Sequence, residues 1–382
     1  ISTEEPEDSM NQKKFLDIKK TCKKQDNIPL NIAITGESDS GKSNFVNAFR
    51  SVSDDEEGAA PTGVKQTTSE VTPYPHPNYS NVTLWDLPGI GTTKFPAKKY
   101  LKLVGFEKFD FFIIISDTHF RENDVKLAQE IQKMKKKFYF VRSKIDNDIN
   151  AERRKRDFSA ERTLKVIRDD CVHSECLQGI ESPRVFLVSS FKQHWCDFSL
   201  LQETLERELP MKKRDALQLV MLNINPEIII KKKKAFQSKL KYWATLSAAG
   251  AAVPVPGLSA NVDAAVLVGA VKDYVQAFGL DIPSLKRLSV STGVPYADLR
   301  AVITSPLAAA EITTELLLKV MTQVGCTASL MAAEEVSRFI PFIGIPIAMG
   351  LSFTTTYKIL NVILNQLADD AQRVFEKAGM QI

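Results

Sequence analysis

The sequence predicts an α/β unit built on a doubly wound, mostly parallel sheet, followed by an all-helical part. Three observations support this prediction. Between residues 30 and 206, short apolar runs alternate with helical patterns, which is typical of parallel strands covered by helices. A glycine-rich loop joins the first run to the first helical pattern. After Pro210 no strand pattern remains, and prolines separate a series of helical stretches.

The expected strands are near-continuous apolar runs, as suits strands buried on both faces: residues 30–35, 82–86, 111–116, 138–143 and 185–189. The expected helices after Pro210 are 217–230, 231–246, 260–278, 282–292, 296–303, 312–324 and 354–377. A short helix within residues 10–28 is expected to pack on this helical part. We therefore expect an N-terminal helical segment at 1–28, the sheet domain at 29–208 and a helical domain at 209–382.

Composition sets the broad class of the chain. It has 382 residues, of which 44% are hydrophobic and 25% charged, and this is ordinary for a globular protein with two domains. The formal net charge of +4 is too small to indicate a nucleic-acid partner. Five cysteines without framework spacing predict reduced thiols in a cytosolic setting. Residues 1–9 are acidic and do not resemble a signal peptide.

Residues 36–43 read G-E-S-D-S-G-K-S, directly after an apolar run and directly before a helical pattern. In that context the loop is expected to point backbone N–H groups at phosphate oxygens at a helix N-terminus. Lys42 is expected to reach the β- and γ-phosphates, and the Ser43 hydroxyl to bind Mg²⁺. The predicted nucleotide-binding residues here are Gly36, Glu37, Asp39, Ser40, Gly41, Lys42, Ser43 and Asn44.

The run at 82–86 ends in D-L-P-G, which predicts a switch that responds to the γ-phosphate. Asp86 is expected to hold Mg²⁺ through water, and the Gly89 N–H to meet the γ-phosphate. A first switch is expected within residues 58–69, where the sequence does not single out one threonine. Its candidate Mg²⁺ ligands are Thr62, Thr67 and Thr68, with Thr68 as the working choice beside Ser43 and Asp86.

Residues 141–146 read V-R-S-K-I-D after another expected strand, which resembles the guanine-reading motif of small GTPases. Asp146 is expected to accept hydrogen bonds from guanine N1–H and the 2-amino group, a pattern that adenine lacks. The stem of Lys144 is expected to cover the base, while Ser143 replaces the usual Asn or Thr. Ser189 and Ser190 are expected to present backbone N–H groups to guanine O6.

The order of these motifs predicts a Ras-like P-loop GTPase domain that binds GTP or GDP with Mg²⁺. An ATP-dependent enzyme remains the alternative, and it requires that Lys144 and Asp146 do not read the base.

Four stretches closely resemble the interferon-inducible immunity-related GTPases: E-G-A-A-P-T-G-V at 57–64, Y-P-H-P-N at 74–78, W-D-L-P-G-I-G-T-T at 85–93 and D-F-F-I-I-I-S at 110–116. The similarity is dense over residues 29–210 and thin beyond, apart from 360–375. Phe109 stands where a tyrosine is usual.

The resemblance implies a dynamin-like GTPase that binds GDP and GTP weakly, dimerises through its nucleotide face and hydrolyses GTP after self-assembly. It implies cell-autonomous innate immunity as the role. The location would be cytoplasmic, with peripheral association to intracellular or pathogen-vacuole membranes. Lys42 resembles the G-K-S members, thought to be effectors. By the same resemblance, Glu37 and Arg121 are expected at the dimer interface.

One departure from the family concerns catalysis. The family has a glutamate in the first switch where this chain has Gln66. A glutamine can orient water but cannot accept its proton as a carboxylate does. The expected catalytic residues are Lys42, Gln66 and Gly89, with slow, assembly-dependent hydrolysis. The alternative is a GTP-gated oligomerising scaffold or membrane-binding module with negligible hydrolysis.

Other features favour ordinary structural roles. The spacing of Cys171, His173, Cys176, His194 and Cys196 matches no usual zinc site. Apolar stretches at 248–271 and 339–353 are interrupted by prolines, which favours buried helices over an inserting hairpin. The basic runs 133–137 and 231–234 are expected on solvated helix faces, with anionic lipid as the alternative.

Overall fold

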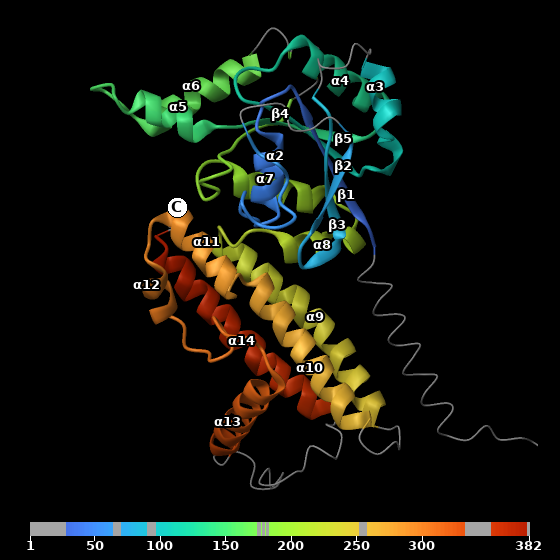
Figure 1. The fold of residues 1–382 in the computed structure, drawn as a ribbon, viewed down its shortest axis with the longest axis vertical. Coiled ribbons are helices and arrows are strands. Elements are labelled where there is room, and N and C mark those ends of the chain that lie inside the picture. Colours follow the sequence, from blue (N-terminus) through green and yellow to red (C-terminus); the bar gives the residue numbers. More distant parts are fainter. Residues whose placement is uncertain are drawn as a thin grey trace, which may run out of the picture. The chain divides into compact units, whose positions relative to one another are not determined.

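The computed structural model describes residues 28–63, 70–89, 97–173, 177, 180, 183–251, 258–332 and 353–379. The chain divides into two compact units, one spanning Ile28–Ile224 and one whose described residues begin at Asn225 (Figure 1). The segment predicted at 1–28 and the apolar stretch 339–353 lie outside the described residues, except for Ile28 and Phe353.

The first unit contains a six-stranded sheet with the order β2-β3-β1-β4-β5-β6. Its strands are β1 Leu30–Gly36, β2 Thr72–His76, β3 Tyr79–Asp86, β4 Phe111–Ser116, β5 Lys137–Arg142 and β6 Val185–Leu187. All neighbouring pairs are parallel except β2 with β3. The predicted mostly parallel sheet is therefore confirmed. β2 was not predicted because Pro73 and Pro75 argue against a strand, and proline is tolerated only at an edge such as this one.

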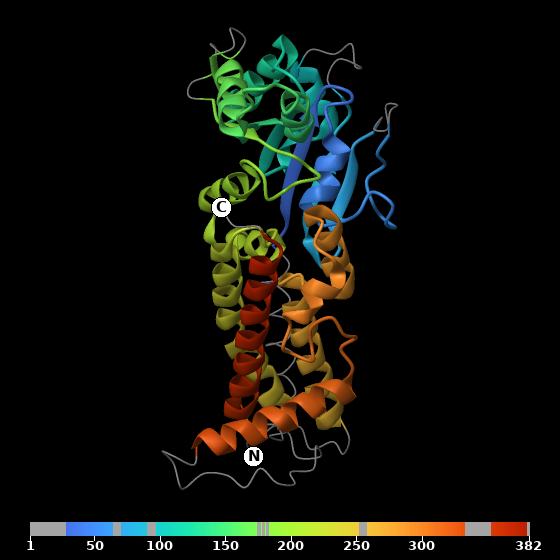
Figure 2. The ribbon, with the colours of Figure 1, turned by 90° about the vertical axis from the view of Figure 1, so that its left-hand side faces the viewer.

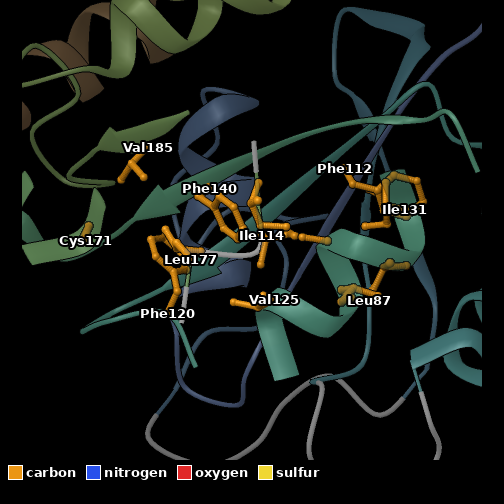
Figure 3. Close-up of a cluster of buried hydrophobic side chains, with 14 of the residues drawn as sticks. Leu87, Phe112, Ile114, Phe120, Val125, Ile131, Phe140, Cys171, Leu177 and Val185 are labelled. Atoms are coloured by element: carbon orange, nitrogen blue, oxygen red, sulfur yellow. The ribbon is translucent and has the colours of Figure 1, made fainter. Parts of the chain in front are cut away.

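Helices cover both faces of this sheet. They are α2 Lys42–Phe49, α3 Ala97–Val104, α4 Glu122–Lys133, α5 Ile145–Glu152, α6 Ala160–His173, α7 Phe198–Glu208 and α8 Met211–Val220. On one face, Phe112 and Ile114 of β4 enter a buried cluster with Val125 and Ile131 of α4 (Figure 3). On the other, α2 and α7 meet through the rings of Phe45 and Phe198, 5.6 Å apart.

α8 belongs with the sheet, although the predicted domain boundary at residue 209 precedes it. It packs against β1, β3 and α7. Its Lys213 forms an ion pair of 2.6 Å with Asp110, which directly precedes β4. The compact unit consequently extends to Ile224.

The second unit is helical in its described residues: α9 Pro226–Ala251, α10 Leu258–Ala277, α11 Ile282–Thr292, α12 Tyr296–Ala301, α13 Thr314–Ala332 and α14 Phe353–Lys377. Helices α9, α10 and α14 pack against one another (Figure 2). No helix in the described residues is long and apolar enough to cross a membrane.

Two expectations for this unit were wrong. The break predicted between residues 230 and 231 lies instead at 221–225, because Pro226 starts α9 and the Asn225 side chain accepts a hydrogen bond of 2.8 Å from the Glu227 N–H. The basic run 231–234 is not wholly solvated. Lys232 is buried and donates to the Ala277 carbonyl, and burial lowers its pKa to about 7.

Candidate nucleotide-binding site

The phosphate loop, residues 37–41, connects β1 to α2 at the edge of the sheet where its parallel strands end. Gly36 has a φ of 141°, and a Cβ there would collide with the Ile115 carbonyl oxygen. Gly41, at the N-cap of α2, has a φ of 87°. Both positions require glycine. The motif therefore determines the backbone conformation of the loop as well as the side chains that it presents.

Lys42 is the first residue of α2 and is buried. Its ammonium donates a hydrogen bond of 2.7 Å to the Glu37 carbonyl across the loop. Burial lowers the pKa of Lys42, and Asp86 and Asp39 oppose this shift electrostatically. The sequence of the loop thus places a partly desolvated cation at its centre.

Ser43 and Asp86 come together from α2 and the end of β3. The Ser43 hydroxyl donates a hydrogen bond of 2.8 Å to Asp86 Oδ2, and both side chains are buried. A hydroxyl and a carboxylate are the oxygen donors that Mg²⁺ prefers, so this pair fits the ion. Gln66 and Thr68 lie outside the described residues, as does Thr67.

The D-x-x-G segment lies directly against the phosphate loop. A Cβ on Gly89 would come within 3.0 Å of the Ser38 nitrogen. The buried Tyr100 of α3 donates a hydrogen bond of 2.8 Å to the Pro88 carbonyl, and its hydroxyl lies 3.0 Å from the Thr35 hydroxyl. Burial raises the pKa of Tyr100 well above its ordinary value. Tyr100 belongs to no sequence motif, and from the sequence alone it cannot be told from an aromatic residue on the buried face of a helix.

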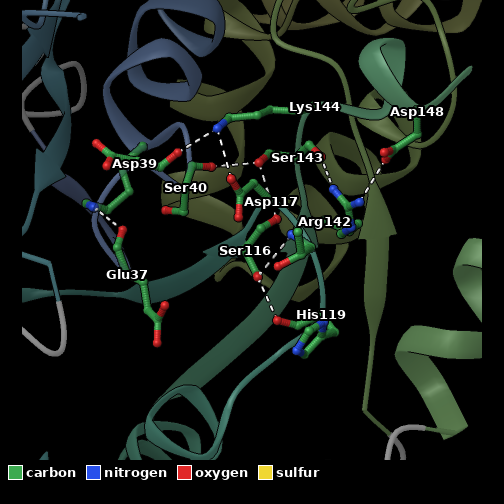
Figure 4. Close-up of polar contacts among 12 residues, drawn as sticks. Glu37, Asp39, Ser40, Ser116, Asp117, His119, Arg142, Ser143, Lys144 and Asp148 are labelled. Atoms are coloured by element: carbon green, nitrogen blue, oxygen red, sulfur yellow. Dashed lines mark hydrogen bonds and ion pairs between the residues drawn. The ribbon is translucent and has the colours of Figure 1, made fainter. Parts of the chain in front are cut away.

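The base loop follows β5 and is hydrogen-bonded to the phosphate loop (Figure 4). The Ser143 hydroxyl donates to the Ser40 carbonyl at 2.6 Å. The Lys144 ammonium donates to the next carbonyl back, that of Asp39, at 2.7 Å. Ser143 therefore connects the loops although it replaces the larger residue expected there. Lys144 also pairs with Asp117, which the sequence analysis did not single out.

Asp146 lies in the first turn of α5 and is 9% exposed. The loop after β6 lies beside it, because the Ile145 N–H donates to the Val188 carbonyl at 3.3 Å. Ser189 is fully buried, and its hydroxyl accepts a hydrogen bond from the Lys192 N–H, whereas Ser190 is half-buried. The predicted base-reading segments therefore do lie side by side.

An ion pair between the buried Arg142 and the half-buried Asp148 supports the base loop. Arg142 donates to Asp148 Oδ2 at 2.7 Å and to the Ser143 carbonyl at 2.5 Å. Burial is the largest influence on Asp148 and raises its pKa, although Arg142 opposes the shift. Sequence reasoning missed this pair, since its residues carry no motif of their own.

Three other polar contacts lie at or near the phosphate loop. Glu37 forms an ion pair with Arg121 at the start of α4. Asp124 accepts a hydrogen bond of 3.0 Å from the Arg121 N–H, and burial raises the pKa of this carboxyl to about 6. Asn44 donates to Asp54 at 3.1 Å.

The cysteines show no metal or disulfide chemistry in the part of the chain that the structure describes. There, no three histidine, cysteine or acidic side chains cluster as a metal site, and Cys171 and Cys196 are free thiols. Burial raises their pKa values to about 11 and about 12. Cys176 lies outside the described residues.

The fold and the loop between β1 and α2 define a P-loop GTPase. Comparison with known proteins narrows this class: the model of the interferon-inducible GTPase (IIGP) family matches residues 5–378. The chain belongs to that family, which confirms the resemblance seen in its sequence.

Individual relatives agree with this assignment. The chain is 42% identical over 351 residues to interferon-inducible GTPase 5 of Rattus norvegicus, covering 91% of this chain and 75% of the relative. It is 36% identical over 353 residues to interferon-gamma-inducible GTPase 10 of Mus musculus, covering 91% and 81%. It is 40% identical over 293 residues to interferon-inducible GTPase 1 of the same species, covering 76% and 70%.

Proposed function

We propose that this protein binds GTP with Mg²⁺ and hydrolyses it to GDP and phosphate, and that dimerisation or oligomerisation in the nucleotide-bound state activates it. One observation carries the proposal: the base loop is hydrogen-bonded to the phosphate loop through two successive carbonyls, those of Asp39 and Ser40. These contacts fix the distance between the two loops. The site therefore suits a ligand whose base and phosphate chain are held at a fixed separation. Family membership supports the same conclusion.

The phosphate end supplies electrostatic stabilisation rather than covalent chemistry, and water is the nucleophile. Lys42 binds the β- and γ-phosphates and stabilises the charge that develops on them. Ser43 and, through water, Asp86 would hold Mg²⁺ together with a first-switch residue, for which Thr68 is the candidate. The bound ion would neutralise phosphate charge. The Gly89 N–H meets the γ-phosphate, and Gln66 orients water.

Guanine is selected at the other end of the site. Asp146 accepts two hydrogen bonds from the base, and adenine would leave this buried carboxylate unpaired. The Lys144 stem covers the base, and backbone N–H groups at Ser189 and Ser190 donate hydrogen bonds to its O6. An ATP-dependent enzyme is the alternative that these contacts disfavour.

Assembly and cellular setting rest on the family relationship. We infer a homodimer or oligomer formed through the nucleotide face, with Glu37 and Arg121 at its interface. The Arg121 side chain is 55% exposed, so it is accessible to a second copy. The inferred role is cell-autonomous innate immunity, with peripheral association to intracellular or pathogen-vacuole membranes.

The test measures phosphate release from GTP across a series of protein concentrations, with light scattering recorded in parallel. Specific activity that rises together with scattering supports assembly-activated hydrolysis. High turnover by the dilute monomer would contradict it. Nucleotide binding with flat, negligible turnover would instead support the GTP-gated scaffold, the alternative favoured by Gln66 in place of a carboxylate.

A further inference from the structure

Asp117 follows β4 directly and reaches the base loop from a third element of the sheet edge. Its Oδ2 lies 2.9 Å from the Lys144 ammonium, and 27 residues separate the two in sequence. The same ammonium donates to the Asp39 carbonyl. Lys144 therefore joins two partners, and Asp117 is the charged one (Figure 4).

The bridge connects two backbone positions in an unfavourable conformation. Asp39 has a φ of 63° and Lys144 a φ of 58°, although neither is glycine. A left-handed conformation is unfavourable for a residue other than glycine, so surrounding contacts have to hold it. The hydrogen bond from the Lys144 ammonium to the Asp39 carbonyl connects one such residue to the other.

A lysine alone holds such a bond poorly. Its long side chain loses rotamer entropy when it is held in one place, and its ammonium is strongly hydrated. A carboxylate as second partner of the ammonium restricts the positions that the side chain can take. Asp117 is itself placed by the turn after β4, in which the Ser116 hydroxyl donates to the His119 carbonyl at 2.9 Å.

We propose that Asp117 is a positioning residue for guanine-nucleotide binding, acting through Lys144. It holds the Lys144 ammonium against the phosphate loop, so that the loop and the lysine stem are already in place when the nucleotide arrives. This inference rests on the proposed function. Because preorganisation acts on binding, Asp117 affects the affinity for nucleotide and leaves turnover at saturation unchanged.

The test is a double-mutant cycle on GDP affinity, measured by calorimetry with Mg²⁺ for wild type, Asp117→Ala, Lys144→Ala and the double variant. Both side chains of the pair are more than one-third exposed, so solvent screening limits the effect. Asp117→Ala is expected to weaken GDP binding about fivefold. In the Lys144→Ala background the same change is expected to have no further effect, because the partner is gone.

Two further readouts separate positioning from a general structural role. The kcat of Asp117→Ala at saturating GTP is expected to stay within about twofold of wild type, and its affinity defect to shrink in 1 M salt. Asp157→Ala is the matched control. It removes an exposed carboxylate that also pairs with a cation, Arg162, at the longer distance of 3.8 Å. Its GDP affinity is expected to equal that of wild type.

Equal GDP affinity in wild type and Asp117→Ala would overturn this inference, as would the same weakening with and without Lys144. Wild-type protein that fails to bind GDP would overturn the proposed function as well. Since wild type is measured in the same series, the two failures are distinguishable.

Discussion

The two ends of the site hold their charges differently. At the phosphate end, Lys42 and Asp124 are buried. Burial lowers the pKa of Lys42 and raises that of Asp124, so it favours the neutral form of each. At the base end, charges are paired at short range, Lys144 with Asp117 and Arg142 with Asp148. The charges of these four base-end side chains are therefore balanced by the protein itself, whereas the Asp146 carboxylate is left for the base. At the phosphate end, burial disfavours the charged forms of Lys42 and Asp124, so their charge can interact with a ligand that carries charge of its own.

This difference separates what each end does. Groups with imbalanced charge are suited to stabilising charge that appears during a reaction. Groups already paired are suited to holding a shape and reading a base. Substitutions at the two ends should consequently affect different steps, and three predictions test that separation.

The largest effect is expected for Lys42→Ala, which removes the cation at the phosphate end. Hydrolysis of GTP at saturation should fall about a thousandfold, or ~4 kcal/mol of transition-state stabilisation. Guanine should still be preferred over adenine, because the base loop is unchanged. Single-turnover phosphate release measures the first effect, and competition between GDP and ADP the second.

Lys126→Ala serves as the matched control, since this exposed lysine pairs with Glu122 one turn earlier on α4. It should hydrolyse GTP at the wild-type rate. If Lys42→Ala kept wild-type turnover, or lost its base preference, the assignment of separate tasks to the two ends would be wrong.

Asp146→Asn should have the next largest effect, and at the opposite end. Asparagine can donate to the 2-oxo group of xanthine but cannot accept both hydrogen bonds from guanine. Affinity for GTP should fall roughly a hundredfold, or about 3 kcal/mol, while xanthosine triphosphate gains affinity. Hydrolysis of bound xanthosine triphosphate should proceed at the rate of GTP on wild type. Unchanged affinity for GTP in this variant would show that Asp146 does not read the base, as the ATP-dependent alternative requires.

The contrast between the ends also explains what the sequence could predict. The phosphate end is a contiguous motif whose glycines dictate their own backbone, so Lys42 and Ser43 were assigned from eight residues. The base end depends on partners distant in sequence. Asp117 lies 27 residues from Lys144, and Ser143 lies 103 residues from the Ser40 carbonyl to which it donates. No local pattern records such pairs, because the sheet order brings them together.

Helix boundaries followed the same logic. Pro283 and Asp281 mark the start of α11 locally, and its predicted range was confirmed. The break before α9 depends on Pro226 and on the Asn225 side chain, which accepts a hydrogen bond from the Glu227 N–H. Both residues are visible in the sequence, but the break was predicted at the lysine run that follows them. Burial of Lys232 against the end of α10 is a tertiary contact, which no run of lysines can reveal.

The smallest effect is expected for Asp124→Asn, and it concerns stability. Burial raises the pKa of Asp124 from its ordinary value of 3.8 to about 6 in the folded protein. Between about pH 4 and pH 6 the native state therefore binds more protons than the unfolded state. The free energy of unfolding consequently falls as pH rises through this window, and the loss is complete above about pH 6.

Asparagine cannot ionise, so the free energy of unfolding of Asp124→Asn does not fall in this way as pH rises. Its side-chain oxygen can still accept the hydrogen bond from the Arg121 N–H. Relative to wild type, Asp124→Asn should gain stability by roughly 2–3 kcal/mol between pH 4 and pH 7, measured by urea unfolding of the nucleotide-free protein. The trend with pH is the readout, because the new amide changes the absolute stability at every pH.

Glu122→Gln, two residues earlier on the exposed side of α4, gives a control of opposite sign. The hydrogen bond from Lys126 lowers the pKa of Glu122, so its contribution is present at neutral pH and is lost as pH falls. Relative to wild type, this variant should therefore become less stable, not more, as pH rises. A flat trend for Asp124→Asn would show that Asp124 is ionised without cost, and that the phosphate end is as well balanced as the base end.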